Sequence, residues 1–259
     1  MKLDLYQSTR KKYIILSCAV FAREVFHSAA KAKNIIDVKI IDQGLHDTGQ
    51  EHMLSKIQLA MNEIDTKLYD AVLLGYGLCN NGLLGIKSNL PIVIPRAHDC
   101  IAILMGSKEK YQCIFDAFPG TFYRSSGWIE QGGYHLENSD SLTVKMGMET
   151  YEETVAKYGK ENADYLFEAL DSDLRNYSKL TYIDTGVFDD TEYIAEDKKF
   201  AESKNWEFEV IQGNTSIFEK MMNGEWDEEI FQVIPPGCTI GASYDEQIIK
   251  VENVKNTNS

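Results

Sequence analysis

The sequence has no long hydrophobic run. Its longest apolar stretches, such as Ala71 to Leu74 and Pro91 to Pro95, are far shorter than the roughly 20 residues that a membrane-spanning helix needs. The apolar segment before Cys18 extends only from Tyr13 to Leu16, whereas the hydrophobic core of a secretory signal needs about 7 to 15 residues. We therefore expect a cytoplasmic protein that does not span a membrane.

Positive charge is also scarce. The 26 Lys and Arg residues are outnumbered by 40 Asp and Glu residues, which gives a formal net charge of -14. Such a charge repels the phosphate backbone of nucleic acids and the anionic head groups of lipids. We expect a small-molecule substrate, and neither a nucleic acid nor a membrane as partner.

The sequence lacks a CxxC pair, although it has five cysteines: Cys18, Cys79, Cys100, Cys113 and Cys238. An odd number of cysteines in a chain of this length does not indicate a disulfide framework. In a reducing compartment such cysteines pack in the core, act in catalysis or bind metals. Cys113 has the helical spacing of core residues, and Cys238 follows a Pro-Pro-Gly turn, so we expect a core and a loop role respectively.

The hydrophobic pattern predicts an α/β fold. Short apolar runs alternate with segments of helical periodicity, and two of the runs are continuous, as in strands buried on both faces. This order favours a parallel, doubly wound, Rossmann-like sheet joined by right-handed crossovers. In the first half we expect strands at 13–16, 35–41, 71–74 and 91–94. Helices are expected at 19–33 and from an N-cap at Thr48 or Asp47 to about Ile64.

The second half repeats the theme after a helical hairpin from about Met148 to Leu170. Strands are expected at 180–183, 208–211 and 230–234, with helices before about Lys204 and at 216–223. These elements form either a second lobe or an extension of the first sheet. We expect an N-terminal α/β lobe over residues 1–145 and a helical hairpin with a second α/β lobe over residues 146–259.

Thiol and imidazole side chains follow four successive strands of the first half. The strands lead to Cys18, His46, Cys79 and the run Arg96-Ala97-His98-Asp99-Cys100. In open parallel sheets, ligands bind beyond the carboxyl ends of the strands, and thiolate and imidazole are preferred ligands of zinc. We therefore predict a metal site drawn from Cys18, His46, Cys79, His98 and Cys100. The alternatives are packing for the cysteines and turn or helix-capping positions for the histidines.

Other residues near these positions have candidate roles in catalysis and binding. Arg96 suits a substrate carboxylate, or alternatively an internal ion pair. Asp99 either orients a histidine ligand or caps the next helix. The glycine-rich loop with Tyr76 and Gly77 allows close approach of a ligand. The aromatic segment 119–128 is either a lid, in which Trp128 excludes water from the site, or part of the core.

Several of these segments resemble the family catalogued as domain of unknown function 1638. The similarity runs from about Tyr13 to Ile240 and is carried by Gly44–His46, Leu74–Cys79, Ile94–Ile101, Gly106–Ser107, Pro119–Tyr123, Gly127–Trp128, Tyr182–Gly186 and Pro235–Gly237. Family members occur in methanogens and other anaerobes, often encoded beside corrinoid-dependent methyltransferases. The resemblance implies one-carbon metabolism, with a corrinoid protein or methyltransferase as partner. One departure is Asn214, where the resemblance leads us to expect an aspartate.

Three functions fit these observations. In the first, the chain is a zinc enzyme, or a zinc-dependent partner of methyl transfer, that presents a thiolate to a methyl donor. In the second, Cys18, Cys79 and Cys100 hold an iron-sulfur cluster, or the cleft binds a corrinoid. In the third, a metal-free enzyme uses Cys79 or Cys100 as nucleophile and His98 or His46 as base.

Overall fold

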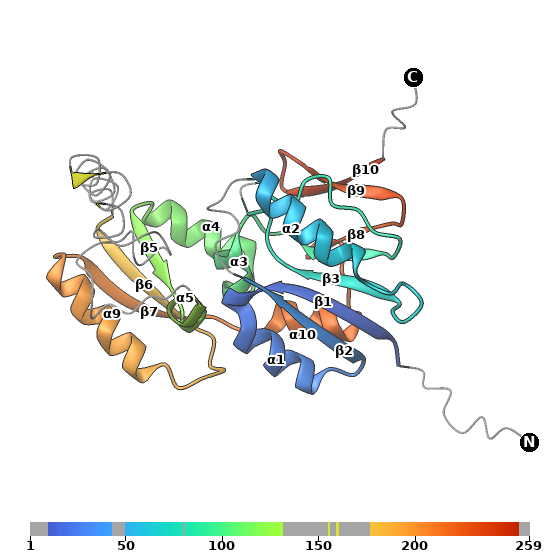
Figure 1. The fold of residues 1–259 in the computed structure, drawn as a ribbon. Coiled ribbons are helices and arrows are strands. Elements are labelled where there is room, and N and C mark those ends of the chain that lie inside the picture. The colour runs from blue at the N-terminus through green and yellow to red at the C-terminus, as the bar shows by residue number, and fades with distance from the viewer. Residues whose placement is uncertain are drawn as a thin grey trace, which may run out of the picture. The chain divides into compact units, whose positions relative to one another are not determined.

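A computed structural model describes residues 10–42, 50–79, 81–131, 155, 159–160 and 177–253 (Figure 1). His46 and the expected helical hairpin at 148–170 lie outside this set, apart from isolated positions in the hairpin. The chain folds into two compact units. The first comprises residues 1–41, 45–103 and 215–259, and the second comprises 42–44 and 104–214.

The first unit contains a five-stranded mixed sheet in the order β2-β1-β3-β4-β8. Its strands are β1 (Lys12–Cys18), β2 (Ile35–Ile41), β3 (Ala71–Gly75), β4 (Ile92–Pro95) and β8 (Phe231–Ile234). The first four are parallel, whereas β8 pairs with β4 in antiparallel orientation. The expected α/β fold with a mostly parallel sheet is confirmed.

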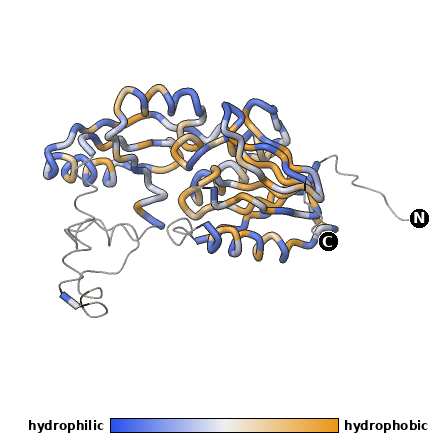
Figure 2. Tube along the Cα trace, turned by 90° about the horizontal axis from the view of Figure 1, so that it is seen from above, coloured by the Kyte–Doolittle hydropathy of each residue, from blue (hydrophilic) through white to orange (hydrophobic). Residues whose placement is uncertain are grey.

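Both faces of this sheet are covered by helices. Figure 1 shows α1 (Ala22–Lys31) and α10 (Ser216–Asn223) on one face and α2 (Gln50–Asn62) on the other. A short 3-10 helix, Ala19–Phe21, connects β1 to α1, and Phe21 packs edge-on against Phe218 of α10. Because β3 and β4 lie between these layers, every residue of both strands is buried, as their continuous apolar pattern predicts. Figure 2 shows that the strands are mostly hydrophobic, whereas hydrophobic and hydrophilic residues alternate along the helices.

The second unit contains a three-stranded parallel sheet in the order β5-β6-β7. Its strands are β5 (Thr121–Arg124), β6 (Lys179–Asp184) and β7 (Glu207–Gln212), and its helices include α4 (Lys108–Ala117), α5 (Ser126–Gln131) and α9 (Thr191–Ser203). Residues 121–131, part of which we considered as a lid, thus form a strand and a helix. Cys113 is exposed on α4, so its expected core position is wrong, because the helix buries none of its residues.

This division differs from the expected lobes 1–145 and 146–259. Strand β5 precedes residue 145 but pairs with β6, whereas α10 and β8 return to the first unit. The strand expected at 230–234 therefore extends the first sheet. A further hairpin, β9 (Cys238–Ala242) and β10 (Ile249–Asn253), also belongs to the first unit. Cys238 is the first residue of β9 rather than a loop residue.

Among the described residues, no helix is long and apolar enough to cross a membrane.

A buried ion pair attaches α9 to β5 in the second unit. Nε of Arg124 lies 3.1 Å from Oδ2 of Asp197, and the two side chains are 4% and 0% exposed. Removing one charge of a buried pair leaves the other uncompensated in a medium of low dielectric constant.

We expect Asp197→Asn to lower the free energy of unfolding by about 3–5 kcal/mol, as measured by urea denaturation. The control is Glu225→Gln, which breaks an exposed pair with Lys33 and should cost less than about 1 kcal/mol. Equal effects of the two substitutions would contradict this assignment.

Candidate functional site

The order of strands in the first sheet reverses at β1. From β1 the chain first adds β2 on one side and then β3 and β4 on the other. In doubly wound sheets, the two segments that leave the strands at such a reversal run in opposite directions. A crevice opens between them at the carboxyl ends of the strands, and ligands bind there. Cys18 ends β1, and Tyr76 to Cys79 follow the end of β3. Two of the predicted thiols therefore belong to the segments that border the switch point.

The loop after β3 is fastened to the segment after β4. The amide of Leu78 donates to the carbonyl of Ala97 at 2.8 Å, and the amide of Cys79 donates to the carbonyl of His98 at 2.9 Å. A methyl group at Gly77 would lie 2.8 Å from both N and Cα of Asp99. The absence of a side chain at Gly77 is thus what allows the two thiol-bearing segments to approach each other.

A close contact also ties this loop to the end of β1. Ser17 pairs with Gly75 across the β1–β3 ladder, and the Ser17 hydroxyl donates to the Gly75 carbonyl at 3.3 Å. A methyl group at Gly75 would collide with the Ser17 side chain. The segments that carry Cys18, Cys79 and Cys100 are therefore joined through direct backbone and side-chain contacts.

Cys79 has an unusual backbone conformation. Its φ is 45°, and Asn81 has a φ of 65°. Non-glycine residues adopt positive φ rarely and at a cost in free energy, and such strain concentrates at functional sites. The following turn is closed by the amide of Gly82, which donates to the Cys79 carbonyl at 3.0 Å. Nothing in the sequence indicates this left-handed conformation for Cys79, whereas asparagine is one of the residue types that adopt it more readily.

Asp99 and Cys100 begin the helix after β4. Oδ1 of Asp99 accepts the amides of Ile101 at 3.0 Å and Ala102 at 3.1 Å, so Asp99 caps α3 (Cys100–Met105). Of the two roles considered for Asp99, the structure thus shows that of helix cap. Cys100 is the first residue of α3, whereas the neighbouring His98 side chain is exposed.

The three thiols influence one another electrostatically. Burial is the main cause that raises the pKa of Cys18 to about 11 and that of Cys79 to about 12. The negative charges of Cys18 and Asp99 further raise the pKa of Cys79. Burial, followed by the charges of Cys79, Asp99 and Cys18, holds the pKa of Cys100 well above its ordinary value. The buried site thus disfavours all three thiolates, and ionisation of one thiol opposes that of its neighbours.

No cationic side chain among the described residues contributes to lowering these three pKa values. The thiols are therefore protonated at neutral pH unless a cation joins them. A low pKa is what activates a nucleophilic cysteine, so this environment does not favour the metal-free nucleophile. It is instead the environment that a thiophilic cation would reverse.

The donor set fits a soft metal in chemistry. Each of the three cysteine residues is partly exposed, although its thiol group is largely buried. Within the described part of the chain, no three His, Cys, Asp or Glu side chains are already arranged to hold a metal ion. Binding through the three thiols would accordingly require a change in their arrangement.

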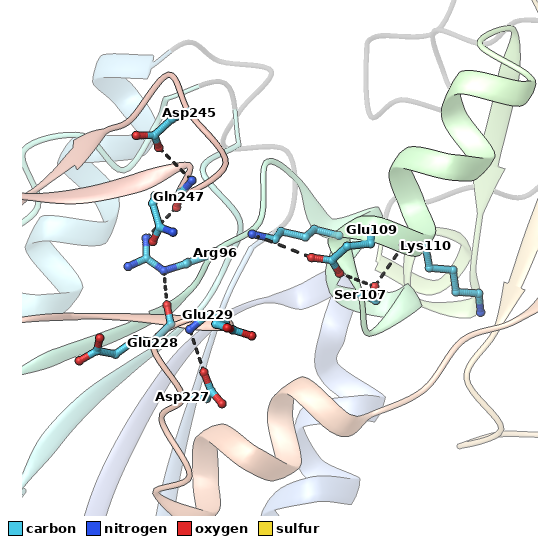
Figure 3. A network of polar contacts seen from close by, with 10 residues as sticks. Arg96, Ser107, Glu109, Lys110, Asp227, Glu228, Glu229, Asp245 and Gln247 are labelled. Atoms are coloured by element: carbon cyan, nitrogen blue, oxygen red, sulfur yellow. Dashed lines mark hydrogen bonds and ion pairs between the residues drawn. The ribbon is translucent and has the colours of Figure 1, made fainter.

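Arg96 is engaged within the protein. It is 9% exposed, and Figure 3 shows its guanidinium among the segments that contain Gln247 and Glu228. Nε donates to the carbonyl of Glu228 at 2.7 Å, and Nη2 donates to Oε1 of Gln232 at 2.7 Å. Nη1 donates to the carbonyls of Gln247 and Ile249 at 2.7 and 2.6 Å. These bonds take the donors that a substrate carboxylate would need, and their acceptors are uncharged, unlike in the expected ion pair.

The remaining candidates lie in different parts of the structure. Tyr76 is buried in the hydrophobic core of the first unit. Trp128 lies on α5 of the second unit. Asn214, also in the second unit, donates its amide to the carbonyl of Leu104 at 2.9 Å and its Nδ2 to that of Met105 at 3.2 Å. An ionised aspartate could not make the second bond, so the departure from the expected aspartate has a structural reason.

Comparison with known proteins identifies a family. A family model described as "Protein of unknown function (DUF1638)" matches residues 40–222. No curated protein and no solved structure matches the chain significantly.

The raised pKa values predict slow alkylation of the site. In metal-free protein at pH 7.5, we expect iodoacetamide to label exposed Cys113 first and Cys79 on the order of 100-fold more slowly. Labelling of Cys79 should accelerate as the pH rises towards 12, since deprotonation creates the reactive thiolate. Peptide mapping by mass spectrometry measures each rate. Preferential labelling of Cys79 or Cys100 at neutral pH would instead favour a nucleophilic cysteine.

The contact at Gly77 predicts the effect of adding one methyl group. Gly77→Ala should force the loop away from Asp99, lower the free energy of unfolding by about 1–3 kcal/mol and speed the labelling of Cys79 and Cys100. Gly186→Ala in the second unit is the control: it also adds a methyl group to a glycine, but the nearest atom would lie at 3.8 Å, an ordinary contact distance. Its positive φ makes that change mildly unfavourable without altering thiol labelling. Unchanged labelling in Gly77→Ala would show that the contact does not position the thiols.

Proposed function

Because the chain belongs to the DUF1638 family, whose description assigns no function, we propose one from the thiol site: zinc binding through Cys18, Cys79 and Cys100. The observation that supports the proposal is that the three segments carrying these cysteines are joined by direct backbone and side-chain contacts beyond the carboxyl ends of β1, β3 and β4. Thiolates are soft ligands that select zinc and iron over magnesium or calcium. Three protein ligands with one open position are typical of catalytic zinc sites.

The chain's own residues supply the setting for such a centre. Gly77 permits the close approach of the loops, and Asp99 fixes the start of α3, where Cys100 lies. The exposed imidazole of His98 is available to a bound molecule or as a further ligand. When bound, zinc would supply the positive charge that keeps a thiol ionised at neutral pH.

We further propose that this centre assists or catalyses methyl transfer in anaerobic one-carbon metabolism. In such a reaction the sulfur of a small thiol substrate forms a bond to the methyl carbon. The bond between that carbon and the donor breaks, and the electron pair leaves with the donor. The thiol proton passes to solvent. A corrinoid protein or its methyltransferase is the proposed partner, and the family resemblance is the support for this setting.

An iron-sulfur cluster or a corrinoid is the second candidate, since the same three cysteines suit an iron-sulfur cluster. Colour separates the candidates, because zinc-thiolate centres do not absorb visible light whereas iron-sulfur clusters and corrinoids do. The visible spectrum of anaerobically purified protein therefore decides between them.

Metal analysis tests the proposal. Anaerobically purified protein should contain about one zinc per chain, measured by inductively coupled plasma mass spectrometry. Cys79→Ser and Cys100→Ser should lose the metal, whereas Cys113→Ser, on exposed α4, should retain it. Protein that folds normally and takes up no zinc under anaerobic conditions would refute zinc binding, and equal loss in Cys113→Ser would refute the assigned ligands.

A further inference from the structure

The hairpin β9–β10, residues 238–253, contacts the chain on either side of the thiol loops. The amide of Gly85 donates to the carbonyl of Ile240 at 2.9 Å, and the amide of Ile240 donates to the carbonyl of Ile86 at 3.2 Å. Gly85 and Ile86 follow closely after the turn that contains Cys79. At its other end the hairpin accepts two hydrogen bonds from Arg96, four positions before Cys100.

The turn of this hairpin is strained. Ile248 has a φ of 62°, and the amide of Ile249 donates to the carbonyl of Gln247 at 2.5 Å, which closes a γ-turn around Ile248. A γ-turn with positive φ is rare, and a β-branched residue in this conformation carries a cost in backbone energy. Yet Ile248 is buried, at 3% exposed. Some interaction has to keep the turn in this form.

Arg96 supplies that interaction. The two carbonyls that flank Ile248 both accept from the same nitrogen, Nη1 of Arg96. The same guanidinium reaches the carbonyl of Glu228 and Oε1 of Gln232, and the backbone amide of Arg96 donates to the carbonyl of Ile230 at 2.8 Å. A planar group with five fixed donors suits this convergence of acceptors, whereas a lysine could satisfy only part of it.

We propose that Arg96 is a positioning residue of the thiol site, which acts by locking the C-terminal hairpin against the segments that carry Cys79 and Cys100. The inference rests on the proposed function only for its zinc readout. Ile240 of the hairpin holds the segment after Cys79 by hydrogen bonds, and Arg96 belongs to the segment before Cys100. Loss of the Arg96 hydrogen bonds to the hairpin lets the two thiols separate, although Arg96 acts on them only through the backbone.

Two readouts test this role in Arg96→Met, which keeps much of the side-chain length but has no donor. The first is zinc affinity, measured by competition with a chromophoric chelator; we expect a loss of roughly 10- to 100-fold, as for residues that orient metal ligands. The second needs no metal. Iodoacetamide should label Cys79 and Cys100 of metal-free Arg96→Met faster than in the wild type, relative to Cys113 in the same chain.

The control is Lys250→Met, which removes an exposed cation from the same hairpin and should change neither readout. If wild-type protein binds no zinc, the proposed function fails while the labelling readout still decides the role of Arg96. If folded Arg96→Met has the labelling rates and the zinc affinity of the wild type, the inference about Arg96 is overturned, whereas the proposed function is not.

Arg96→Lys covers the case in which Arg96→Met does not fold. It retains the charge and part of the bonding, so it should give an intermediate increase in labelling and an intermediate loss of affinity. Circular dichroism and thermal unfolding establish that each variant is folded. If neither variant folds, or if folded Arg96→Lys matches the wild type, Arg96 has no separate positioning role and the inference is overturned.

Discussion

The reversal of strand order at β1 is the constraint on which the candidate site depends. It places the segments after β1 and β3 next to each other at the carboxyl edge of the sheet, and the absence of side chains at Gly75 and Gly77 lets the neighbouring chain approach closely. The hydrogen bonds from Leu78 and Cys79 to the segment after β4 then bring the third thiol to the same edge. The segments that carry Cys18 and Cys100 are connected through the loop after β3 because of sheet topology, not because of local spacing.

The same packing sets the chemistry of the thiols. Burial favours the protonated form of all three thiols, and the charges of neighbouring thiols and of Asp99 add to the effect at Cys79 and Cys100. A pair or triad of thiols in such surroundings is a poor nucleophile by itself. In the proposed function, a bound cation compensates the negative charge and so makes a thiolate available at neutral pH.

Periodicity predicted the parts of the fold that depend on local pattern. The strand at 35–41 and the helix at 216–223 have the expected bounds, and the thiol-bearing loops follow the expected strands. Pairing partners were harder, since an apolar run such as 230–234 reads the same in a parallel or an antiparallel position. The same limit applied to residues 121–124, whose aromatic side chains suit both a lid and a strand.

The residue types of the candidate site could be predicted from the sequence, but the backbone conformations and hydrogen bonds that position them could not. Cysteine and histidine at strand ends are visible in the sequence, whereas the positive φ of Cys79 and Ile248 is not, because both residues ordinarily avoid that conformation. The role of Arg96 depends on backbone carbonyls more than 130 residues away along the chain, and carbonyl groups have no sequence signature. Cys113 has core spacing, but α4 has no buried face.

X-ray absorption at the zinc edge tests the central claim most directly. Protein loaded anaerobically with one equivalent of zinc should show three sulfur neighbours at about 2.3 Å and one lighter atom. Such a shell requires that thiols from three separate segments reach one ion. A shell of only nitrogen and oxygen at about 2.0–2.2 Å would mean that zinc binds elsewhere, and the account of this site would be wrong.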